Sequence, residues 1–371
     1  MLPPTAPRVA FVSHTAEWVG PTNSLSLLLA KVKSKYHLRV FVPGQGPFTE
    51  RLEEIGVPYE SFNALDKWDV LPLRRSIAQW NADLVYANNT HGSSRVAFLA
   101  SRLAGVPFVT HVRGMAWTQK WTRMGYLRFA HGVVAVSRAC ADSVRRFAGD
   151  ERLVVVHNGI PQSSEVAVGD LAAVRTGLGV PSDAFMITSV SHVMPRKGQE
   201  YGLEAFRRVV DARPEAHLVL VGRTDRDPDY VEAFRAEAKA AGLEDRVHLA
   251  GFRRDVEAIL SASSAFLHTA LADPHPRSVI EAMAQGLPVV AFGVDGVAET
   301  VVDGETGILA PAEDVEGLSQ GLLKLMESGD LAENMGRAGE ARAKAHFTDE
   351  ATAVGVAKVI DAVLAGKGPV Q

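Results

Sequence analysis

Two acidic side chains stand eight residues apart in Thr269–Gly307, TALADPHPRSVIEAMAQGLPVVAFGVDGVAETVVDGETG. Asp273 follows the apolar run Ala265–Leu267, and Glu281 lies in the first turns of a helix that we expect to begin near Arg277. The start of a helix presents unpaired N–H groups and the positive end of its dipole, which suit a phosphate. Carboxylates beside it can accept hydrogen bonds from sugar or ribose hydroxyls. A capped structural helix with surface acids would show the same pattern.

Two adjacent cations, Arg196 and Lys197, occupy a loop in the sequence SVSHVMPRKGQEYG, after the predicted strand Phe185–Val190. A diphosphate leaving group gains negative charge as its bond to a sugar breaks, and fixed cations can stabilise that charge without a metal ion. Taken alone, this loop fits a solvated basic turn equally well.

A second group of candidate residues lies in the first half of the chain. His111 and Arg113 stand at the end of a predicted strand in the sequence FVTHVRG. A single histidine is more often structural than catalytic, but a strand end in a basic domain favours a chemical role. Upstream, VGPTNSLSLLLA predicts a turn and then an amphipathic helix with Asn23 or Ser24 near its start.

Short apolar runs alternate with helical patterns, which predicts parallel sheets covered by helices on both faces. The predicted strands are Arg8–Ser13, Leu38–Val42, Leu84–Ala87, Phe108–His111, Val133–Val136 and Val154–Val156, then Phe185–Val190, His217–Val221, Val247–Ala250, Ala265–Leu267 and Val289–Ala291. The turn-rich stretch His157–Asp170 is the predicted linker between them. We therefore expect two doubly wound α/β domains, 1–162 and 163–348, with ligands at the carboxyl ends of the strands.

Charge is distributed unevenly over a net charge of −4. Residues 1–165 hold 19 basic and 12 acidic side chains, a balance of +7, and the remainder holds 20 and 31, a balance of −11. A basic half would attract anions or an anionic membrane surface, although two domains of different origin could also differ by chance. The single cysteine, Cys140, excludes an intrachain disulfide and is expected to be buried on a helix. With no apparent signal peptide or membrane span, we expect a cytoplasmic protein.

The stretch Thr269–Gly307 resembles the signature of the retaining GT-B glycosyltransferases of family GT4. In that signature two glutamates separated by seven residues precede Ala-Met-Ala-x-Gly-x-Pro-Val-Val. The similarity continues through Asp295–Glu299 and Asp303–Gly307. It implies two Rossmann-like domains with an interdomain cleft, the first binding the acceptor and the second binding the nucleotide-sugar. It also implies a C-terminal helix, at about 349–371, that packs back on the first domain.

The resemblance also implies roles for individual residues. Glu281 would bind the ribose hydroxyls of the donor, and Asp273 would contact the transferred sugar. Lys197 would hold the diphosphate with Arg196 or with His192, and we favour Arg196 because its charge does not depend on pH. His111 would contact the sugar and help to stabilise the charged transition state, and Arg113 would contact the acceptor or a phosphate. The catalytic residues that the resemblance implies are thus His111, Arg196, Lys197 and Asp273. The further donor-binding residues implied are Gly20, Gly222, Phe252, Arg253, Arg277, Ser278 and Val279.

The sequence departs from the family pattern at several positions. Asp273 replaces the usual glutamate, which shortens its reach, and His192 stands where an arginine is usual. Pro276 replaces a common glycine and has no N–H to donate to a phosphate, so the N–H groups of Arg277 and Ser278 would make that contact. Pro21 replaces one residue of a Gly-Gly pair.

Aromatic and basic residues interleave in the stretch MAWTQKWTRMGYLRFAHG. Trp117, Trp121, Tyr126 and Phe129 alternate there with cations. This pattern suits a helix that covers the sheet, a membrane interface or a nucleic acid. We favour packing, keep peripheral membrane contact as the second interpretation, and expect no nucleic-acid partner.

Together these observations predict a retaining, metal-independent glycosyltransferase with no cofactor beyond its nucleotide-sugar co-substrate, a UDP- or GDP-sugar. The acceptor would be a glycan, a lipid-linked glycan or a small molecule, in polysaccharide or glycolipid biosynthesis. A GT-B-shaped sugar-nucleotide epimerase and an inactive homologue acting as a partner subunit are the alternatives.

Overall fold

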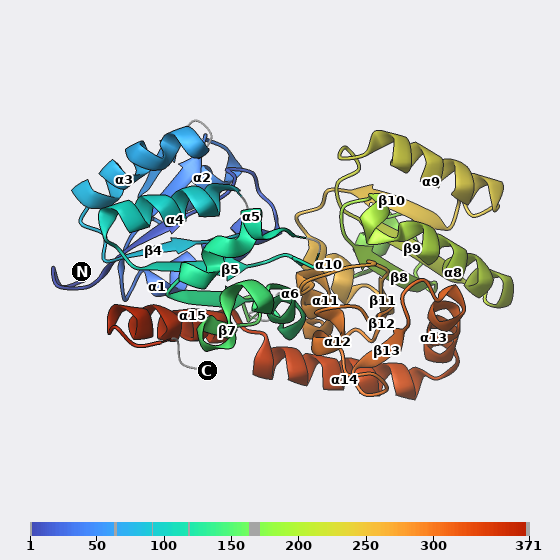
Figure 1. Cartoon of the computed structure of the whole chain (residues 1–371). Helices are drawn as coiled ribbons and strands as arrows, with labels where there is room; N and C mark the ends of the chain where they lie inside the picture. The colour runs from blue at the N-terminus through green and yellow to red at the C-terminus, as the bar shows by residue number, and fades with distance from the viewer. Residues whose placement is uncertain (1, 63–64, 91, 118, 163–170, 369–371) are drawn as a thin grey trace. The chain divides into compact units, whose positions relative to one another are not determined.

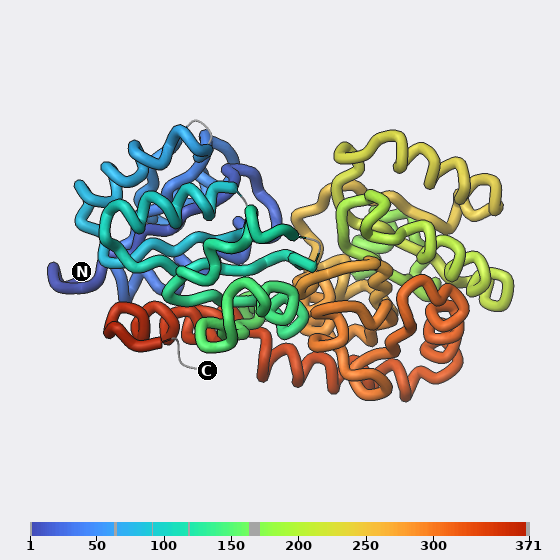
Figure 2. The backbone as a smooth tube through the Cα atoms, viewed as in Figure 1, coloured from blue at the N-terminus to red at the C-terminus, as the bar shows by residue number. Residues whose placement is uncertain are grey.

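The computed structural model describes residues 2–62, 65–90, 92–117, 119–162 and 171–368 (Figure 1 and Figure 2). The chain divides into two compact units. Unit 1 comprises Met1–Pro161 and Phe347–Gln371, and unit 2 comprises Gln162–His346. Most of the predicted linker, 163–170, lies outside the described residues, as do the last three residues of the predicted C-terminal segment.

Unit 1 is built on a sheet whose described strands are all parallel, in the order β3-β2-β1-β4-β5-β6-β7. These strands are β1 (Arg8–Val12), β2 (His37–Pro43), β3 (Tyr59–Phe62), β4 (Leu84–Ala87), β5 (Phe108–Val112), β6 (Gly132–Ala135) and β7 (Leu153–Val155). Every residue of β4, β5 and β6 is buried, as expected for strands covered on both faces. The strand order reverses between β1 and β4, which is where ligands of such sheets bind.

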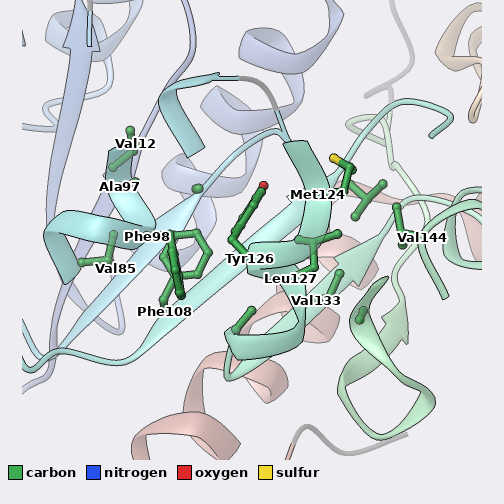
Figure 3. Close-up of a cluster of buried hydrophobic side chains, with 14 of the residues drawn as sticks. Val12, Val85, Ala97, Phe98, Phe108, Met124, Tyr126, Leu127, Val133 and Val144 are labelled. Atoms are coloured by element: carbon green, nitrogen blue, oxygen red, sulfur yellow. The ribbon is translucent and has the colours of Figure 1, made fainter. Parts of the chain in front are cut away.

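Helices cover both faces of this sheet. They are α1 (Gly20–Val32), α2 (Pro47–Glu54), α3 (Val70–Gln79), α4 (Gly92–Ala104), α5 (Trp121–Met124), α6 (Arg138–Ala148) and α15 (Asp349–Leu364), with short 3-10 turns at Lys67–Asp69, Gly125–Phe129 and Asp150–Arg152. On one face, Phe98, Phe108 and Tyr126 pack ring against ring (Figure 3). Cys140 is buried on α6, as predicted.

The C-terminal helix α15 completes the opposite face of unit 1. Val356, Val359 and Ile360 of α15 are buried in the same cluster as Phe11 of β1 and Leu25 of α1. In Figure 1 the red α15 lies beside α1, at the other end of the sequence. The helix is therefore a structural part of unit 1 although more than 180 residues of chain separate it from β7.

The chain leaves unit 1 and returns to it through two adjacent segments. Ile160 N–H donates to the Phe347 carbonyl at 2.9 Å, and Asp349 N–H donates to the Ile160 carbonyl at 2.8 Å. A Cβ at Gly159 would lie 2.0 Å from the Thr348 carbonyl oxygen, so only glycine permits this approach. Outgoing and returning segments are thus hydrogen-bonded to each other inside unit 1.

Unit 2 repeats the architecture with the described strand order β10-β9-β8-β11-β12-β13, again all parallel. Its strands are β8 (Phe185–Val190), β9 (Ala216–Val221), β10 (Val247–Gly251), β11 (Ala265–His268), β12 (Val289–Phe292) and β13 (Gly307–Ala310). Its helices are α7 (Leu171–Gly177), α8 (Gln199–Ala212), α9 (Pro228–Ala240), α10 (Val256–Ser261), α11 (Arg277–Ala284), α12 (Val297–Thr300), α13 (Val315–Glu327) and α14 (Gly329–His346), with a 3-10 turn at Pro195–Lys197. The order reverses between β8 and β11.

The prediction for the start of α1 was wrong by several residues. The helix begins at Gly20 rather than near Asn23 or Ser24. Pro21 fits the first turn because its fixed φ matches a helix and its missing N–H is not needed there. The cap comes from inside the helix, where the Thr22 hydroxyl accepts from Val19 N–H at 3.0 Å. Among the described residues, no helix is both long and apolar enough to cross a membrane.

Candidate active site

An ion pair spans the point in unit 2 where the strand order reverses. Lys197, in the loop after β8, lies with its Nζ 2.7 Å from Oδ2 of Asp273, in the loop after β11. Both side chains are largely buried, with 13% and 11% of their surfaces exposed. His268, the last residue of β11, approaches the same carboxylate oxygen with its Nε2 at 3.5 Å. The structure therefore brings together two of the residues predicted as catalytic.

Backbone contacts between the two loops fix this pair. Gly198 adopts φ +63°, and a Cβ at that position would lie 2.2 Å from the Thr269 carbonyl oxygen. The Thr269 hydroxyl in turn donates to the Lys197 carbonyl at 2.9 Å. The glycine that follows Lys197 in the sequence is thus needed for its left-handed conformation and for its close contact with the end of β11.

The Lys197–Asp273 pair keeps the carboxylate ionised. Burial alone would raise the pKa of Asp273, but the adjacent His268 ring and the charge of Lys197 hold the pKa below its usual range. Burial lowers the pKa of His268, and its contact with Asp273 opposes that shift. A buried, ionised aspartate beside a lysine is suited to accepting hydrogen bonds from hydroxyl groups.

Helix α11 begins directly after this loop. Its N-cap is Pro276, and no side chain caps it. Arg277 Nη2 lies 3.3 Å from Glu281 Oε1, one turn later. Burial raises the pKa of Glu281, and Arg277 opposes this, while a third of the Glu281 side chain remains exposed. Ser278 and Val279 complete the first turn, whose N–H groups suit an anion.

Gly296 holds the loop that carries Asp273. Its N–H donates to the Asp273 carbonyl at 3.1 Å, and a Cβ there would lie 2.0 Å from the Pro274 carbonyl oxygen. The Asp-Gly pair at this point in the sequence therefore supports the loop through its backbone.

The remaining predicted cations and glycines lie at the same edge of unit 2. Arg196 is exposed and forms no ion pair within the described residues. His192 is partly buried, and burial together with four surrounding cations lowers its pKa, so the imidazole is neutral near pH 7. Gly222, after β9, lies against this loop, since a Cβ there would be 1.9 Å from the Ser191 carbonyl oxygen.

Two of the residues predicted to bind the donor, Phe252 and Arg253, follow β10. Phe252 is 61% exposed. The Arg253 side chain is held in an ion pair with Asp255, because its Nε and Nη2 lie 2.8 and 2.6 Å from the two carboxylate oxygens.

In unit 1, His111 lies in β5 and is completely buried. Its Nδ1 accepts from the Tyr86 hydroxyl at 2.8 Å and from Arg113 Nη2 at 3.2 Å. A guanidinium can only donate, so the imidazole proton must be on Nε2. Within the described residues that Nε2 has no hydrogen-bond partner. Burial and the Arg113 charge hold the pKa of His111 well below its usual value.

Arg113 is held by residues from three strand ends. Its Nε donates to Asn88 Oδ1 at 3.0 Å, and its Nη1 donates to Asn158 Oδ1 at 2.8 Å. Asn88 also donates to the Pro21 carbonyl at 2.9 Å, at the first turn of α1. Gly20 itself begins α1 with open space around it, so nothing in unit 1 requires glycine there.

Sequence reasoning missed four residues of these two groups: Tyr86, Asn88 and Asn158 in unit 1, and His268 in unit 2. Asn88 comes directly after the buried strand β4, which is a signal that could have identified it, whereas Asn158 lies three residues after the partly exposed β7 and lacks that signal. His268 marks the end of a buried strand, as Asn88 does. Tyr86 lies inside β4, among apolar residues, and gave no such signal.

The aromatic and basic stretch divides into two groups. Tyr126 is buried in the core (Figure 3). Trp117, Trp121 and Phe129 are 56%, 54% and 62% exposed. Lys120, Arg123 and Arg128 are exposed beside them. Tyr126 is therefore a core residue, Trp121 packs edge-on against the buried Phe147 while staying half exposed, and Trp117 and Phe129 lie at the surface.

Comparison with known proteins finds a matching family model for each of the two units. The family model described as glycosyl transferases group 1 matches residues 173–342, and the model described as glycosyltransferase family 4 matches residues 24–163. The Anabaena protein HepE, solved in complex with UDP, is 25% identical with a TM-score of 0.86, over 96% of this chain and all of that one. That likeness and the two parallel-sheet units confirm the predicted GT-B fold.

Two curated relatives are similar over shorter or more divergent stretches. The lipopolysaccharide core biosynthesis glycosyltransferase LpsE of Rhizobium meliloti is 26% identical over 62% of this chain and 64% of its own length. An Escherichia coli enzyme named UDP-Gal:alpha-D-GlcNAc-diphosphoundecaprenol alpha-1,3-galactosyltransferase is 23% identical over 79% of this chain and 81% of its own. With family models matching both units, the chain belongs to the glycosyltransferases of group 1 and family 4.

Proposed function

We propose that this protein transfers a sugar, with retention of configuration, from a UDP- or GDP-sugar to an acceptor hydroxyl in glycan or glycolipid biosynthesis. The observation that carries the proposal is the buried Lys197–Asp273 pair beside the uncapped start of α11, with Glu281 one turn further on. UDP is favoured because HepE binds it and the Escherichia coli relative is named for a UDP-sugar.

In the proposed complex the donor lies along the carboxyl edge of the sheet in unit 2. Lys197 and Arg196 bind the diphosphate, and the N–H groups of Arg277, Ser278 and Val279 donate to it. Arg196 is preferred to His192 because the lowered pKa of His192 leaves it neutral. Glu281 accepts from the ribose hydroxyls, and Asp273 accepts from the sugar. Gly222, Phe252 and Arg253 flank the nucleotide.

In the proposed reaction the bond between the anomeric carbon and the diphosphate oxygen breaks while the acceptor oxygen bonds to that carbon on the same face. The acceptor proton passes to the departing diphosphate, and no step uses a metal ion. Lys197 and Arg196 stabilise the diphosphate as it gains charge. His111 donates a hydrogen bond from Nε2–H to the transferred sugar, as its neutral tautomer allows. Arg113 contacts the acceptor.

Peripheral membrane contact through unit 1 is a second part of the proposal. It is supported by the exposed Trp117, Trp121 and Phe129 and by the cations beside them, because such a surface suits the interface of an anionic bilayer.

The test is a thermal-shift screen against nucleotide-sugars, followed by assay of the best one. A ligand that binds the folded state raises its melting temperature. Glu281→Ala should abolish the shift, whereas Glu327→Ala, an exposed glutamate at the end of α13, should leave it unchanged. Lys197→Ala should reduce kcat/KM by about 2–4 kcal/mol of transition-state stabilisation, and the exposed Lys324→Ala should not.

Two results would contradict this function. Unchanged turnover in Lys197→Ala would remove Lys197 from the mechanism. Formation of an epimerised nucleotide-sugar, without any glycosylated product, would assign the protein to the epimerases instead. Since transfer by a retaining enzyme preserves the anomeric configuration, proton NMR of the product decides the stereochemistry.

A further inference from the structure

Unit 1 contains a pocket of about 420 Å³ at the carboxyl edge of its sheet. His14, Asn89 and Arg113 line it from the ends of β1, β4 and β5. The strand order of unit 1 reverses between β1 and β4, so the pocket lies where sheets of this kind bind ligands. Its volume is in the range of sites for small molecules.

The charged side chains lining this pocket are basic. Arg95 of α4 and Arg123 of α5 line it together with Arg113, and no carboxylate is among the described lining residues. Neither Arg95 nor Arg123 forms an ion pair in the described part of the chain, although Arg95 donates to the Thr122 carbonyl at 3.3 Å. Three guanidinium groups, with no carboxylate among the described lining residues, give the pocket a basic lining.

One of the three guanidinium groups is oriented before any ligand arrives. Asn88, Asn158 and His111 each contact a different nitrogen of Arg113. An arginine held in one orientation loses little entropy on binding and presents a planar fork that matches phosphate oxygens. Gly92, in the first turn of α4, also lines the pocket, where the helix dipole favours an anion.

A neutral sugar would be recognised differently. Its hydroxyls both donate and accept, so sites for neutral sugars combine carboxylates and amides with donors, as the edge of unit 2 does with Asp273 and Glu281. This pocket is also lined by the amides of Asn89 and Gln119, but its charged described lining residues are all arginines. In the proposed complex the donor diphosphate is bound by Lys197 and Arg196 of unit 2.

We propose that this pocket binds a phosphate group carried by the acceptor, so that the substrate class is a phosphorylated acceptor. The inference rests on the proposed function and adds to it the chemistry of the second substrate. The phosphate contacts Arg95, Arg113 and Arg123, and the rest of the acceptor presents its hydroxyl to the donor sugar. A phosphorylated soluble sugar and a lipid diphosphate share this chemistry.

Calorimetric titration of the full chain, with its donor site first saturated by UDP, tests the proposal. Inorganic pyrophosphate is the common probe, and glucose 6-phosphate and farnesyl diphosphate distinguish a soluble source from a lipid source. In Arg95→Ala/Arg123→Ala each probe that binds the wild type should bind at least about tenfold more weakly. Arg75→Ala/Arg102→Ala removes two exposed arginines elsewhere on unit 1 and should bind as the wild type does.

Both arginines are exposed, so the double variant should fold, and its unliganded melting temperature and its UDP affinity verify this. Arg123→Ala alone provides a second, milder variant with an intermediate loss. Unaltered probe binding in the double variant would overturn the proposal, as would an equal loss in Arg75→Ala/Arg102→Ala or no probe binding by the UDP-saturated wild type. Failure of the wild type to bind UDP at all would instead contradict the proposed function.

Discussion

At the scale of single residues, His111 shows how burial selects one chemical form. The ring is completely buried, its Nδ1 faces Tyr86 and Arg113, and the contact with the Arg113 guanidinium requires a neutral imidazole with its proton on Nε2. A protonated ring would place a second positive charge beside Arg113. His111 is therefore suited to donating one hydrogen bond rather than to exchanging protons.

This neutral state predicts a pH dependence of stability. Because the folded pKa of His111 lies below that of the unfolded chain, the unfolded state binds more protons once the pH falls below about 6.5, and stability decreases by up to about 1.4 kcal/mol per pH unit. His111→Gln should reduce the loss of melting temperature of unit 1 between about pH 7.5 and pH 5.5. His131→Gln, at an exposed histidine whose pKa is also lowered, should reduce it less. An identical pH profile in wild type and His111→Gln would contradict this.

At the scale of elements, the donor site depends on contacts between loops that follow different strands. Gly198 and Gly222 allow the loop after β8 to touch the ends of β11 and β9, and Gly296 supports the loop that carries Asp273. Backbone packing behind the loops therefore sets the positions of the side chains that are predicted to bind the donor.

A pair of glycine variants separates the cost of the left-handed backbone conformation from the cost of the close contact between loops. Gly198→Ala and Gly242→Ala both place a side chain at positive φ, +63° and +68°, but a Cβ at Gly242 has nothing within 4 Å. Gly242→Ala should cost about 1 kcal/mol from backbone strain. Gly198→Ala should cost about 1–3 kcal/mol more because of the clash with Thr269, and should weaken UDP binding. Equal melting temperatures and equal UDP affinities in the two variants would show that this contact does not position the site.

Many of the strands could be predicted from the sequence, and the strands that could not be predicted lack a specific physical signal. Buried parallel strands are nearly continuous apolar runs, so β4, β5 and β8 were placed accurately. The edge strand β3 has the sequence YESF, and β13 begins with glycine, so neither carries that signal. Candidate site residues such as Lys197, Asp273 and His111 could be predicted from their residue types and from their positions at or after the ends of predicted strands. Their partners, His268 and Tyr86, come from distant segments, and only the folded chain brings them together.

At the scale of the whole molecule, net positive charge and most of the exposed aromatic residues lie in the first half of the sequence. The balance of +7 over residues 1–165 against −11 over the remainder gives unit 1 the more basic character. Trp117 and Phe129, exposed beside cations, belong to this unit. The basic pocket lined by Arg95, Arg113 and Arg123 lies in the same unit.

Cosedimentation with vesicles tests whether this surface binds membranes. The protein should associate with vesicles of phosphatidylcholine and phosphatidylglycerol, less with phosphatidylcholine alone, and less at high salt. Trp117→Ala/Phe129→Ala should lower the bound fraction. Trp68→Ala/Leu71→Ala, which removes exposed apolar side chains elsewhere on unit 1, should not. Equal binding by all three proteins would remove these aromatic residues from any membrane contact.

The return of the chain to unit 1 has a consequence for how the protein is made. Chains are synthesised from the N-terminus, and domains generally fold as they emerge from the ribosome. Here α15, which covers one face of the first sheet, is synthesised only after all of unit 2. The nascent first unit must therefore keep an apolar face uncovered while the second unit is translated. Unit 2 can thus reach its native state before unit 1, although unit 1 begins to be made first.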